Sequence, residues 1–259
     1  MNDELIIEQD GAVARLTVNR PEVRNALSIG IVQRIAQTLR GLSRDRAVRV
    51  FVLTGAGDRV FISGADVREF REQLATPESA LSYDAAAEQL QSALREVPQP
   101  VIARIQGHAV GSGTIVAASC DFRIAVRTAK FGIPVAKFGF LASVPDTLRL
   151  VQLVGPAKAK WLLMTGQLIE APEAHAIGLI DQVVEPENLE ATVNTLATTL
   201  AANAPLTIKA TKQIIETMTA PSANVASGAP WYAEIFHSRD FREGLDAFLT
   251  KRKPEFTGE

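Results

Sequence analysis

The chain has 259 residues, of which 47% are hydrophobic and 22% are charged, and its formal net charge is −2. This composition is that of a globular protein with one large core, and the lack of a basic excess excludes the charge pattern of a nucleic-acid-binding protein. The single cysteine excludes an internal disulfide and is typical of a reducing compartment, so we expect a cytoplasmic location.

The N-terminal part predicts a hairpin, a helix and a buried strand in succession. Two alternating apolar runs flank Asp10 and Gly11, a dipeptide that favours a tight turn between strands. Ser28 precedes a helical pattern that runs through Leu42, and its hydroxyl is a candidate N-cap. The run VRVFVLTGAG then predicts a buried strand that ends in a Gly-rich turn, and FISGADVREF predicts a loop that enters a helix.

The rest of the chain alternates helices with strands and then becomes mainly helical. A helix is expected from Pro77 to about Glu96, and buried strands are expected at PVIARIQG and CDFRIAV, which is typical of βαβ units. The most apolar stretch, residues 101–118, is interrupted by Arg104 and by glycines, so we expect no membrane span. From Pro156 onward, Pro and Gly punctuate successive helices. We therefore predict an α/β core over about the first 155 residues and a helical C-terminal part.

Two Gly-containing loops, each between a strand and a helix, are the candidate chemical site. They are LTGAG…FISGAD and IQGHAVGSG. Glycine lets a backbone approach a ligand closely, and a helix N-terminus presents unpaired N–H groups. Two such loops facing one another would direct two N–H donors at one oxygen, which suits an enolate beside a thioester. The alternative is a pair of ordinary tight turns, and neither loop fits a phosphate-binding or dinucleotide-binding pattern.

Several blocks of the sequence occur in the order expected of the enoyl-CoA hydratase/isomerase (crotonase) family. They include NRPEVRNALS, VRVFVLTGAGDRVFISGADVREF, QPVIARIQGHAVGSG, AKFGIP and EGLDAFLTKRKPEF, and the chain resembles the family over nearly its whole length. The resemblance implies an α/β (α+β-like) fold with a core sheet built of ββα turns. It implies that residues 1–200 form the acyl-CoA-binding core, and that residues 201–259 form a helical region that assembles a homotrimer or a dimer of trimers.

The same resemblance implies the ligand and the residues that hold it. The substrate is an acyl-CoA thioester of the kind used in fatty acid metabolism, with coenzyme A as part of the substrate and no separate cofactor. The two enolate-stabilising donors are the N–H groups of Ala65, in SGAD, and Ser112, where the family usually has the middle glycine of a Gly-Gly-Gly run. A serine there keeps its N–H. The substrate-binding residues implied are Arg24, Ser63, Gly64, Asp66, Val67, Gly111, Phe248 and Lys251.

Some of these implied contacts have plainer alternatives. Arg24 is otherwise a solvated surface charge, and Asp66 is otherwise a charge near the first turn of a helix. Phe248 is implied, with Lys251, to reach the nucleotide site of a neighbouring subunit. Its alternative is a helical residue that faces the core of its own chain.

The chain departs from the family at the positions of the two hydratase glutamates. Those glutamates share the water that adds across the double bond, so general acid–base catalysis needs both. Ile115 stands at the first position and Val135 at the second, and neither side chain transfers protons. We therefore do not expect ordinary hydration. Three reactions of an acyl-CoA stay open, namely isomerisation, decarboxylation and hydrolysis, so the protein would be an isomerase or a lyase. A non-catalytic acyl-CoA-binding or scaffold role also stays open.

Asp146 is the candidate to replace the missing acids. It follows Pro145 in ASVPDTLRL, where Pro suits the first turn of a helix, and the resemblance places this helix beside the acyl group. The aryl-CoA dehalogenases of the family place an aspartate at the position of Ser143. The alternatives are a helix-start acid for Asp146 and an N-cap for Ser143. Lys137 and His108 are further candidates, with a surface lysine and a packed side chain as their alternatives, and scattered histidines predict no metal site.

Overall fold

Two β-sheets carry the fold, and successive turns of the chain build both of them. The computed structural model describes residues 3–69, 77–219 and 237–255. The larger sheet has the strand order β1-β2-β3-β5-β7-β10, and the smaller one has the order β4-β6-β8-β9. The larger sheet contains β1 (Leu5–Asp10), β2 (Val13–Val18), β3 (Val50–Gly55), β5 (Val101–Ile105), β7 (Phe122–Val126) and β10 (Gln182–Val184).

The smaller sheet is made by the strands that directly follow β3, β5 and β7. Each of these pairs sends its first strand to the larger sheet and its second to the smaller, which is the ββα arrangement expected from the sequence. β4, β6 and β8 are parallel, and β9 joins β8 antiparallel. These strands are β4 (Val60–Ile62), β6 (His108–Val110), β8 (Lys130–Gly132) and β9 (Ile169–Glu170).

The N-terminal hairpin and the helix after it follow the sequence prediction. β1 and β2 pair antiparallel, with Asp10 opposite Val13 and Gly11 at φ 55° in the turn. Helix α1 (Ile29–Leu42) begins after Ser28, whose Oγ accepts the N–H of Ile31 at 3.3 Å. This cap satisfies one of the N–H groups that the first turn of a helix leaves unpaired.

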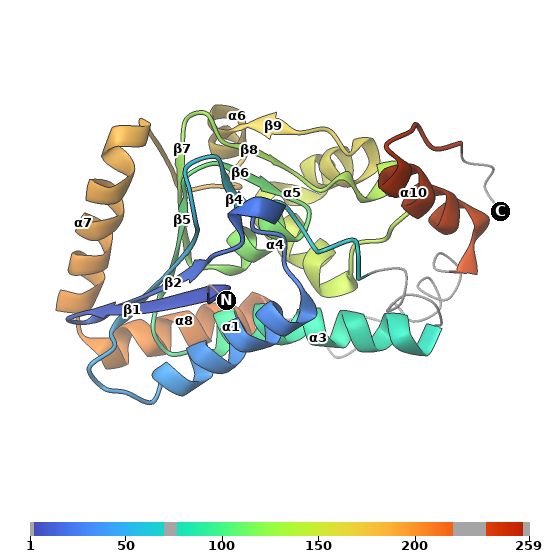
Figure 1. The fold of residues 1–259 in the computed structure, drawn as a ribbon. Coiled ribbons are helices and arrows are strands. Elements are labelled where there is room, and N and C mark those ends of the chain that lie inside the picture. Colours follow the sequence, from blue (N-terminus) through green and yellow to red (C-terminus); the bar gives the residue numbers. More distant parts are fainter. Residues whose placement is uncertain (1–2, 70–76, 220–236, 256–259) are drawn as a thin grey trace.

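The helices surround the sheets on several sides. In Figure 1, α1, α3 and α8 run together beneath the strands, while α7 stands at one end of the molecule and α10 at the other. None of the helices in the described ranges combines the length and the apolarity that a membrane crossing requires. The helices after α1 are α3 (Pro77–Glu96), α4 (Ser112–Ser119), α5 (Val144–Thr165), α6 (Ala171–Ala176), α7 (Leu189–Ala202), α8 (Pro205–Thr219) and α10 (Arg239–Thr250), with short 3-10 helices η1 (Pro21–Val23), η2 (Pro134–Phe138) and η3 (Pro186–Asn188).

The central strands are buried on both faces, and the single cysteine belongs to their core. All six residues of β3 are buried, as expected of a parallel strand covered on both sides. Cys120 is fully buried at the end of α4. Burial raises the pKa of the Cys120 thiol to about 12, so this side chain packs as a small apolar group and is no nucleophile.

The sheets extend further along the chain than the sequence predicts. The prediction that the α/β core ends near residue 155 is wrong, because β10 pairs parallel with β7 and β9 pairs with β8. These strands have three and two residues, too few for a periodic pattern to distinguish them from the ends of helices. The helix expected after Asp66 falls mainly on residues 70–76, outside the described residues.

A buried ion pair joins the C-terminal helix α8 to the start of the central strands. Lys212 is 8% exposed, and its Nζ donates to Asp121 Oδ2 at 2.7 Å and to the carbonyls of Leu94 and Gln99. The same Asp121 oxygen accepts the N–H of Val101 at 2.7 Å. One carboxylate thus ties the first residue of β5 to α8.

Lys212→Met should lower the free energy of unfolding by about 3 kcal/mol, because it leaves the partly buried carboxylate of Asp121 without its cation. Urea unfolding followed by circular dichroism measures the change. Lys209→Met, on an exposed position of the same helix, is the matched control and should stay within about 0.5 kcal/mol of the wild type. Equal losses in the two variants would contradict the role assigned to the ion pair.

Candidate functional site

The loop after β4 is held by a short bridge to the segment that precedes α1. The N–H of Leu27 donates to the carbonyl of Gly64 at 2.9 Å, and the N–H of Asp66 donates to the carbonyl of Leu27 at 2.8 Å. This is an isolated parallel bridge between Leu27 and Ala65. A parallel bridge uses the groups on either side of the central residue, so the N–H of Ala65 points away from Leu27.

The second loop ends at the first residue of α4. Gly111 adopts φ 56° and ψ −124°, and its N–H donates to the carbonyl of Gly132 at 2.8 Å. Its carbonyl accepts the N–H groups of Thr114 and Ile115. Ser112 begins the helix, where an N–H has no intrahelical acceptor. Within the described ranges, neither the N–H of Ser112 nor that of Ala65 has a hydrogen-bond partner.

The two loops lie against each other, with glycines at the point of contact. Gly64 has φ 124°, and a Cβ added there would lie 4.0 Å from the nitrogen of Ser112 and 3.4 Å from the carbonyl oxygen of Val110. A Cβ added at Gly111 would lie 3.6 Å from Cα of Gly64. The sequence expectation that these two loops face one another is therefore met in the backbone. Among the described residues, no side-chain atom lies within 4 Å of the Cβ position of Gly64 or Gly111.

Apolar side chains stand at the two positions that the sequence resemblance aligns with hydratase glutamates, and that alignment stays a prediction. Ile115 is 3% exposed in α4, and Val135 packs half-buried against the same core from η2. The helix that carries Ile115 is seated directly on β4, because a Cβ added at Gly113 would lie 2.0 Å from the carbonyl oxygen of Ile62. Only glycine permits this contact.

Ser143 and Asp146 form the start of α5. The Oγ of Ser143 accepts the N–H of Asp146 at 3.1 Å, so the N-cap alternative describes Ser143. The Oδ1 of the half-buried Asp146 accepts a hydrogen bond from Nε2 of Gln91 at 3.2 Å. Gln91 is buried, and the sequence analysis did not single it out. A proton-transfer role for Asp146 stays a prediction.

The other proton-transfer candidates lie at the surface. Lys137 is exposed on η2. His108 is exposed on β6, where its Nδ1 accepts the N–H of Lys130 at 3.2 Å. Surface positions describe both side chains better than a place in an apolar pocket.

The residues implied to bind the coenzyme A portion fall into two groups in space. Ser63, Gly64, Asp66 and Val67 surround Ala65 by sequence, and Arg24 lies beside them because its carbonyl accepts the N–H of Ser63 at 3.2 Å. The side chain of Arg24 is exposed. Gly111 belongs to the second loop. None of these contacts with a ligand is tested by the structure, and they stay predictions.

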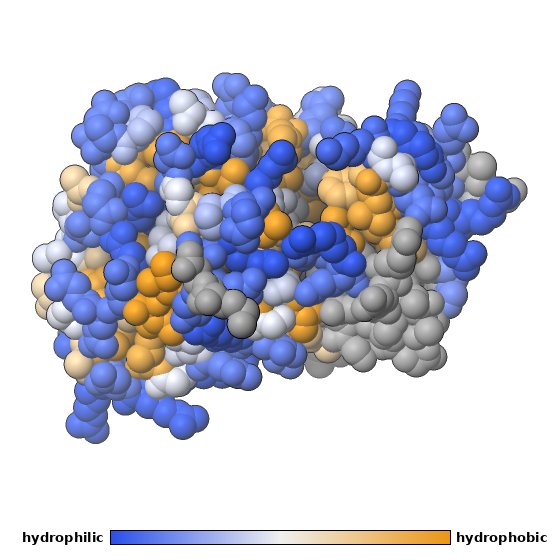
Figure 2. Space-filling model, viewed as in Figure 1, coloured by the Kyte–Doolittle hydropathy of each residue, from blue (hydrophilic) through white to orange (hydrophobic). Residues whose placement is uncertain are grey.

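Helix α10 of the same chain packs over the first loop. Ala65 and Val67 contact the cluster of Phe241 and Leu245, and apolar side chains gather where α10 meets the rest of the molecule (Figure 2). Phe248 stacks edge-on against Phe138 of its own chain, with ring centroids 4.9 Å apart. Phe248 therefore has a contact within its own chain, but it is not a core residue because it is 41% exposed. Lys251 ends α10 at φ 57°, and a contact of either residue with a neighbouring subunit stays a prediction.

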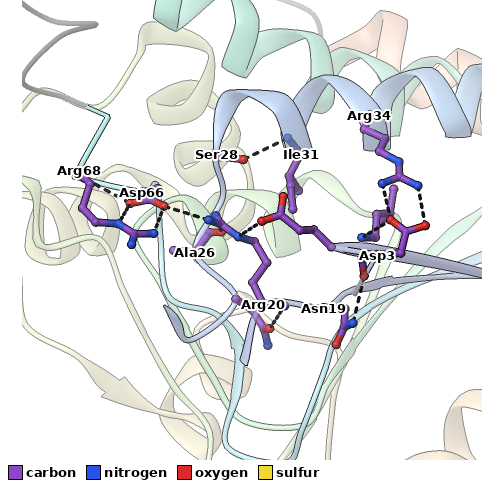
Figure 3. Close-up of polar contacts among 12 residues, drawn as sticks. Asp3, Asn19, Arg20, Ala26, Ser28, Ile31, Arg34, Asp66 and Arg68 are labelled. Carbon is purple, nitrogen blue, oxygen red and sulfur yellow. Dashed lines mark hydrogen bonds and ion pairs between the residues drawn. The ribbon is translucent and has the colours of Figure 1, made fainter. Parts of the chain in front are cut away.

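Asp66 lies between two guanidinium groups, one buried and one exposed. It is 6% exposed, and its Oδ2 accepts Nη2 of Arg20 at 3.3 Å and Nη2 of Arg68 at 2.6 Å (Figure 3). The hydrogen bonds and charge of Arg68, joined by the charge of Arg20, hold the pKa of the Asp66 carboxyl below its ordinary value. The sequence analysis did not single out Arg20, because its burial beside Asp66 depends on the fold.

Comparison with known proteins gives relatives over the whole chain. The family described as enoyl-CoA hydratase/isomerase matches residues 8–259. The short-chain-enoyl-CoA hydratase of Clostridium acetobutylicum is 35% identical, with 98% of this chain and 97% of that protein covered. A crystal structure of an enoyl-CoA hydratase/carnithine racemase from Magnetospirillum magneticum is 36% identical with a TM-score of 0.82, covering 100% and 97% of the chains. A methylmalonyl-CoA decarboxylase in complex with 2-nitronate-propionyl-CoA is 28% identical with a TM-score of 0.90, covering 99% of both.

The lowered pKa of Asp66 makes the free energy of unfolding depend on pH in the acidic range. A carboxylate with a depressed folded pKa contributes stability above its unfolded pKa, and this contribution is lost as the pH falls through the folded value. The free energy of unfolding of the wild type should therefore drop below about pH 4, and Asp66→Asn should flatten that drop. Urea titrations between pH 6 and pH 3 measure it. Asp58→Asn, at a fully exposed position, should keep the wild-type pH dependence; the same flattening there would contradict the assignment.

Proposed function

Because the chain belongs to the enoyl-CoA hydratase/isomerase family, we propose that it binds an acyl-CoA thioester and stabilises the enolate of that thioester. The N–H groups of Ala65 and Ser112 form the oxyanion hole. The observation that carries this proposal is the pair of unpartnered backbone N–H groups on two loops in contact at Gly64 and Gly111. Fixed donors of this kind favour the transition state, because negative charge reaches the oxygen only as the α-carbon reacts.

The reaction proposed is one that forms the enolate without a protein base. Ile115 and Val135 leave no carboxylate at the positions that activate water in hydratases, so hydration is disfavoured. Loss of CO2 from a 2-carboxyacyl-CoA needs no base: the bond between the α-carbon and the carboxylate breaks, and its electron pair passes into the enolate. A water molecule then gives a proton to the α-carbon, and the hydroxide that remains combines with the CO2 as bicarbonate. An apolar wall favours this step, because it solvates the departing carboxylate poorly. The TM-score of 0.90 to a methylmalonyl-CoA decarboxylase supports the same reaction class.

Two further elements belong to this proposal. Arg24 and the residues around Ala65 contact the coenzyme A portion, and the chain assembles as a homotrimer or a dimer of trimers. Phe248 is 41% exposed beside its contact with Phe138, which leaves surface for a second chain. A non-catalytic acyl-CoA-binding or scaffold role is the second candidate, and the apolar pair Ile115 and Val135 is the observation that favours it.

The wild-type protein should bind acyl-CoA thioesters and release CO2 from a 2-carboxyacyl-CoA such as methylmalonyl-CoA. It should not hydrate crotonyl-CoA. Calorimetric titration with propionyl-CoA measures binding, and mass spectrometry of the products measures both reactions. Efficient hydration of crotonyl-CoA would contradict the base-free reaction. Binding without any turnover would favour the scaffold role. No binding of any acyl-CoA below about 1 mM would contradict the proposed function itself.

Gly64→Ala should lower kcat for the observed reaction about 100-fold, because it places a methyl group between the two donors, and loss of one such donor costs 100- to 1000-fold. Gly57→Ala is the matched control: Gly57 also has a positive φ, 80°, but has open space around its Cβ position. Both variants carry backbone strain, so thermal melting shows how much of each effect is a loss of folded protein. Similar activity losses in both variants would show that strain, and not the blocked space, lowers the rate.

A further inference from the structure

One guanidinium group reaches both sides of the bridge that orients the Ala65 N–H. Nη1 of Arg20 donates to the carbonyl of Ala26 at 2.8 Å, and Nη2 donates to Oδ2 of Asp66 at 3.3 Å. Ala26 directly precedes Leu27, and Asp66 directly follows Ala65. Arg20 is 9% exposed, and Figure 3 shows its side chain extending toward Asp66. The two contacts therefore clamp the bridge from opposite sides.

Arg20 itself is fixed to the sheets. Its backbone N–H donates to Oδ1 of Asn25 at 3.1 Å, and its carbonyl accepts the N–H of Asn25 at 2.8 Å. Nδ2 of Asn25 donates at 2.9 Å to the carbonyls of Ala56, just after β3, and Val60, the first residue of β4. The backbone of Arg20 is thus bonded, through the buried Asn25, to the residue after β3 and to the first residue of β4.

The bridge needs such a clamp, because it is short and flanked by glycine. It consists of two hydrogen bonds outside any continuous strand, and Gly64 before Ala65 has a wide range of accessible conformations. We propose that Arg20 is a positioning residue, which sets the direction of the Ala65 N–H through Ala26 and Asp66. This inference rests on the proposed function, since it assigns the clamp to the enolate-stabilising donor.

A planar guanidinium suits this role, because its donors form a rigid fork that reaches two acceptors at once. Arg68 provides the contrast within the same cluster. It bonds the same carboxylate through Nε at 2.8 Å and Nη2 at 2.6 Å, but its side chain is 61% exposed. Arg68 neutralises Asp66 and has no contact with Ala26 among the described residues. Replacing Arg68 by Met therefore removes its positive charge beside Asp66 but leaves both hydrogen bonds of Arg20 in place.

The test compares the affinity for an enolate mimic with the affinity for a neutral ligand. The probes are 2-nitronate-propionyl-CoA and propionyl-CoA, each titrated into wild type, Arg20→Met and Arg68→Met. The two ligands share the coenzyme A and thioester portions, and the nitronate adds a charged nitro group at the α-carbon. The change in the Kd ratio between wild type and variant therefore reports the oxyanion contact, because Arg20 lies beside the Ala65 loop and the nitro group is the same in every titration. Arg20→Met should reduce the preference for the nitronate about 10- to 100-fold and change the Kd of propionyl-CoA less than about threefold. Arg68→Met should keep the wild-type ratio within about twofold.

The outcomes separate this inference from the proposal beneath it. If the wild type shows no preference for the nitronate, the proposed oxyanion hole is wrong, and so is the inference about Arg20. A wild type that prefers the nitronate, with the same ratio in Arg20→Met, overturns the inference alone, and so does an equal loss in both arginine variants. If Arg20→Met does not fold, Asp66→Asn replaces it as the variant with a weakened clamp, with a reduced ratio expected and an unchanged ratio overturning the inference.

Discussion

The candidate site depends on one constraint, the bonding of Leu27 to the residues on both sides of Ala65. This bonding turns the Ala65 N–H away from Leu27. The partner of the bridge comes from a segment some forty residues earlier in the chain, so the geometry of the site is a long-range property of the fold. Because the bridge is short, the buried Arg20 and its two acceptors are part of the same constraint. A buried charge is tolerated there because it is paired and hydrogen-bonded.

The two-sheet architecture brings the loops together. Strands β3 and β5 of the larger sheet are each followed directly by a strand of the smaller sheet. The ends of β4 and β6 lie next to each other because these strands are parallel neighbours. The first loop leaves β4 and the second leaves β6, so adjacency of the loops follows from strand order. The apolar Ile115 and Val135 follow on α4 and η2. The chemistry proposed for such a site relies on charge stabilisation by the backbone and on a substrate that brings its own leaving group.

Much of the fold could be predicted from the sequence where local signals were strong. The turn at Gly11, the cap at Ser28 and the helix from Pro77 to Glu96 all depend on residues close in the chain, and the structure contains all three. Strands of two or three residues, such as β9 and β10, are too short to show an alternating apolar pattern, so the sequence predicts only helices in that region. Their existence depends on hydrogen bonds to β8 and β7, which are long-range.

For the site, the sequence indicated the loops but not what fixes them. The glycine pattern indicated two candidate loops, and the resemblance to the family's motifs implied Ala65 and Ser112 as the donors. Arg20, in contrast, has no local signal that distinguishes it from a surface cation. Burial of a charge next to a specific carboxylate is visible only once the chain is folded. The same holds for Gln91, which contacts Asp146 across two helices.

Gly113 gives the arrangement a mechanical property. Its backbone rests on Ile62 so closely that a side chain would collide with the carbonyl there, and Ile62 is the last residue of β4, three positions before Ala65. Ser112 is therefore attached to the same strand from which Ala65 emerges. A contact this close leaves no gap in which the start of α4 could shift relative to β4, so we expect the distance between the two amides to vary less than the positions of the outer helices.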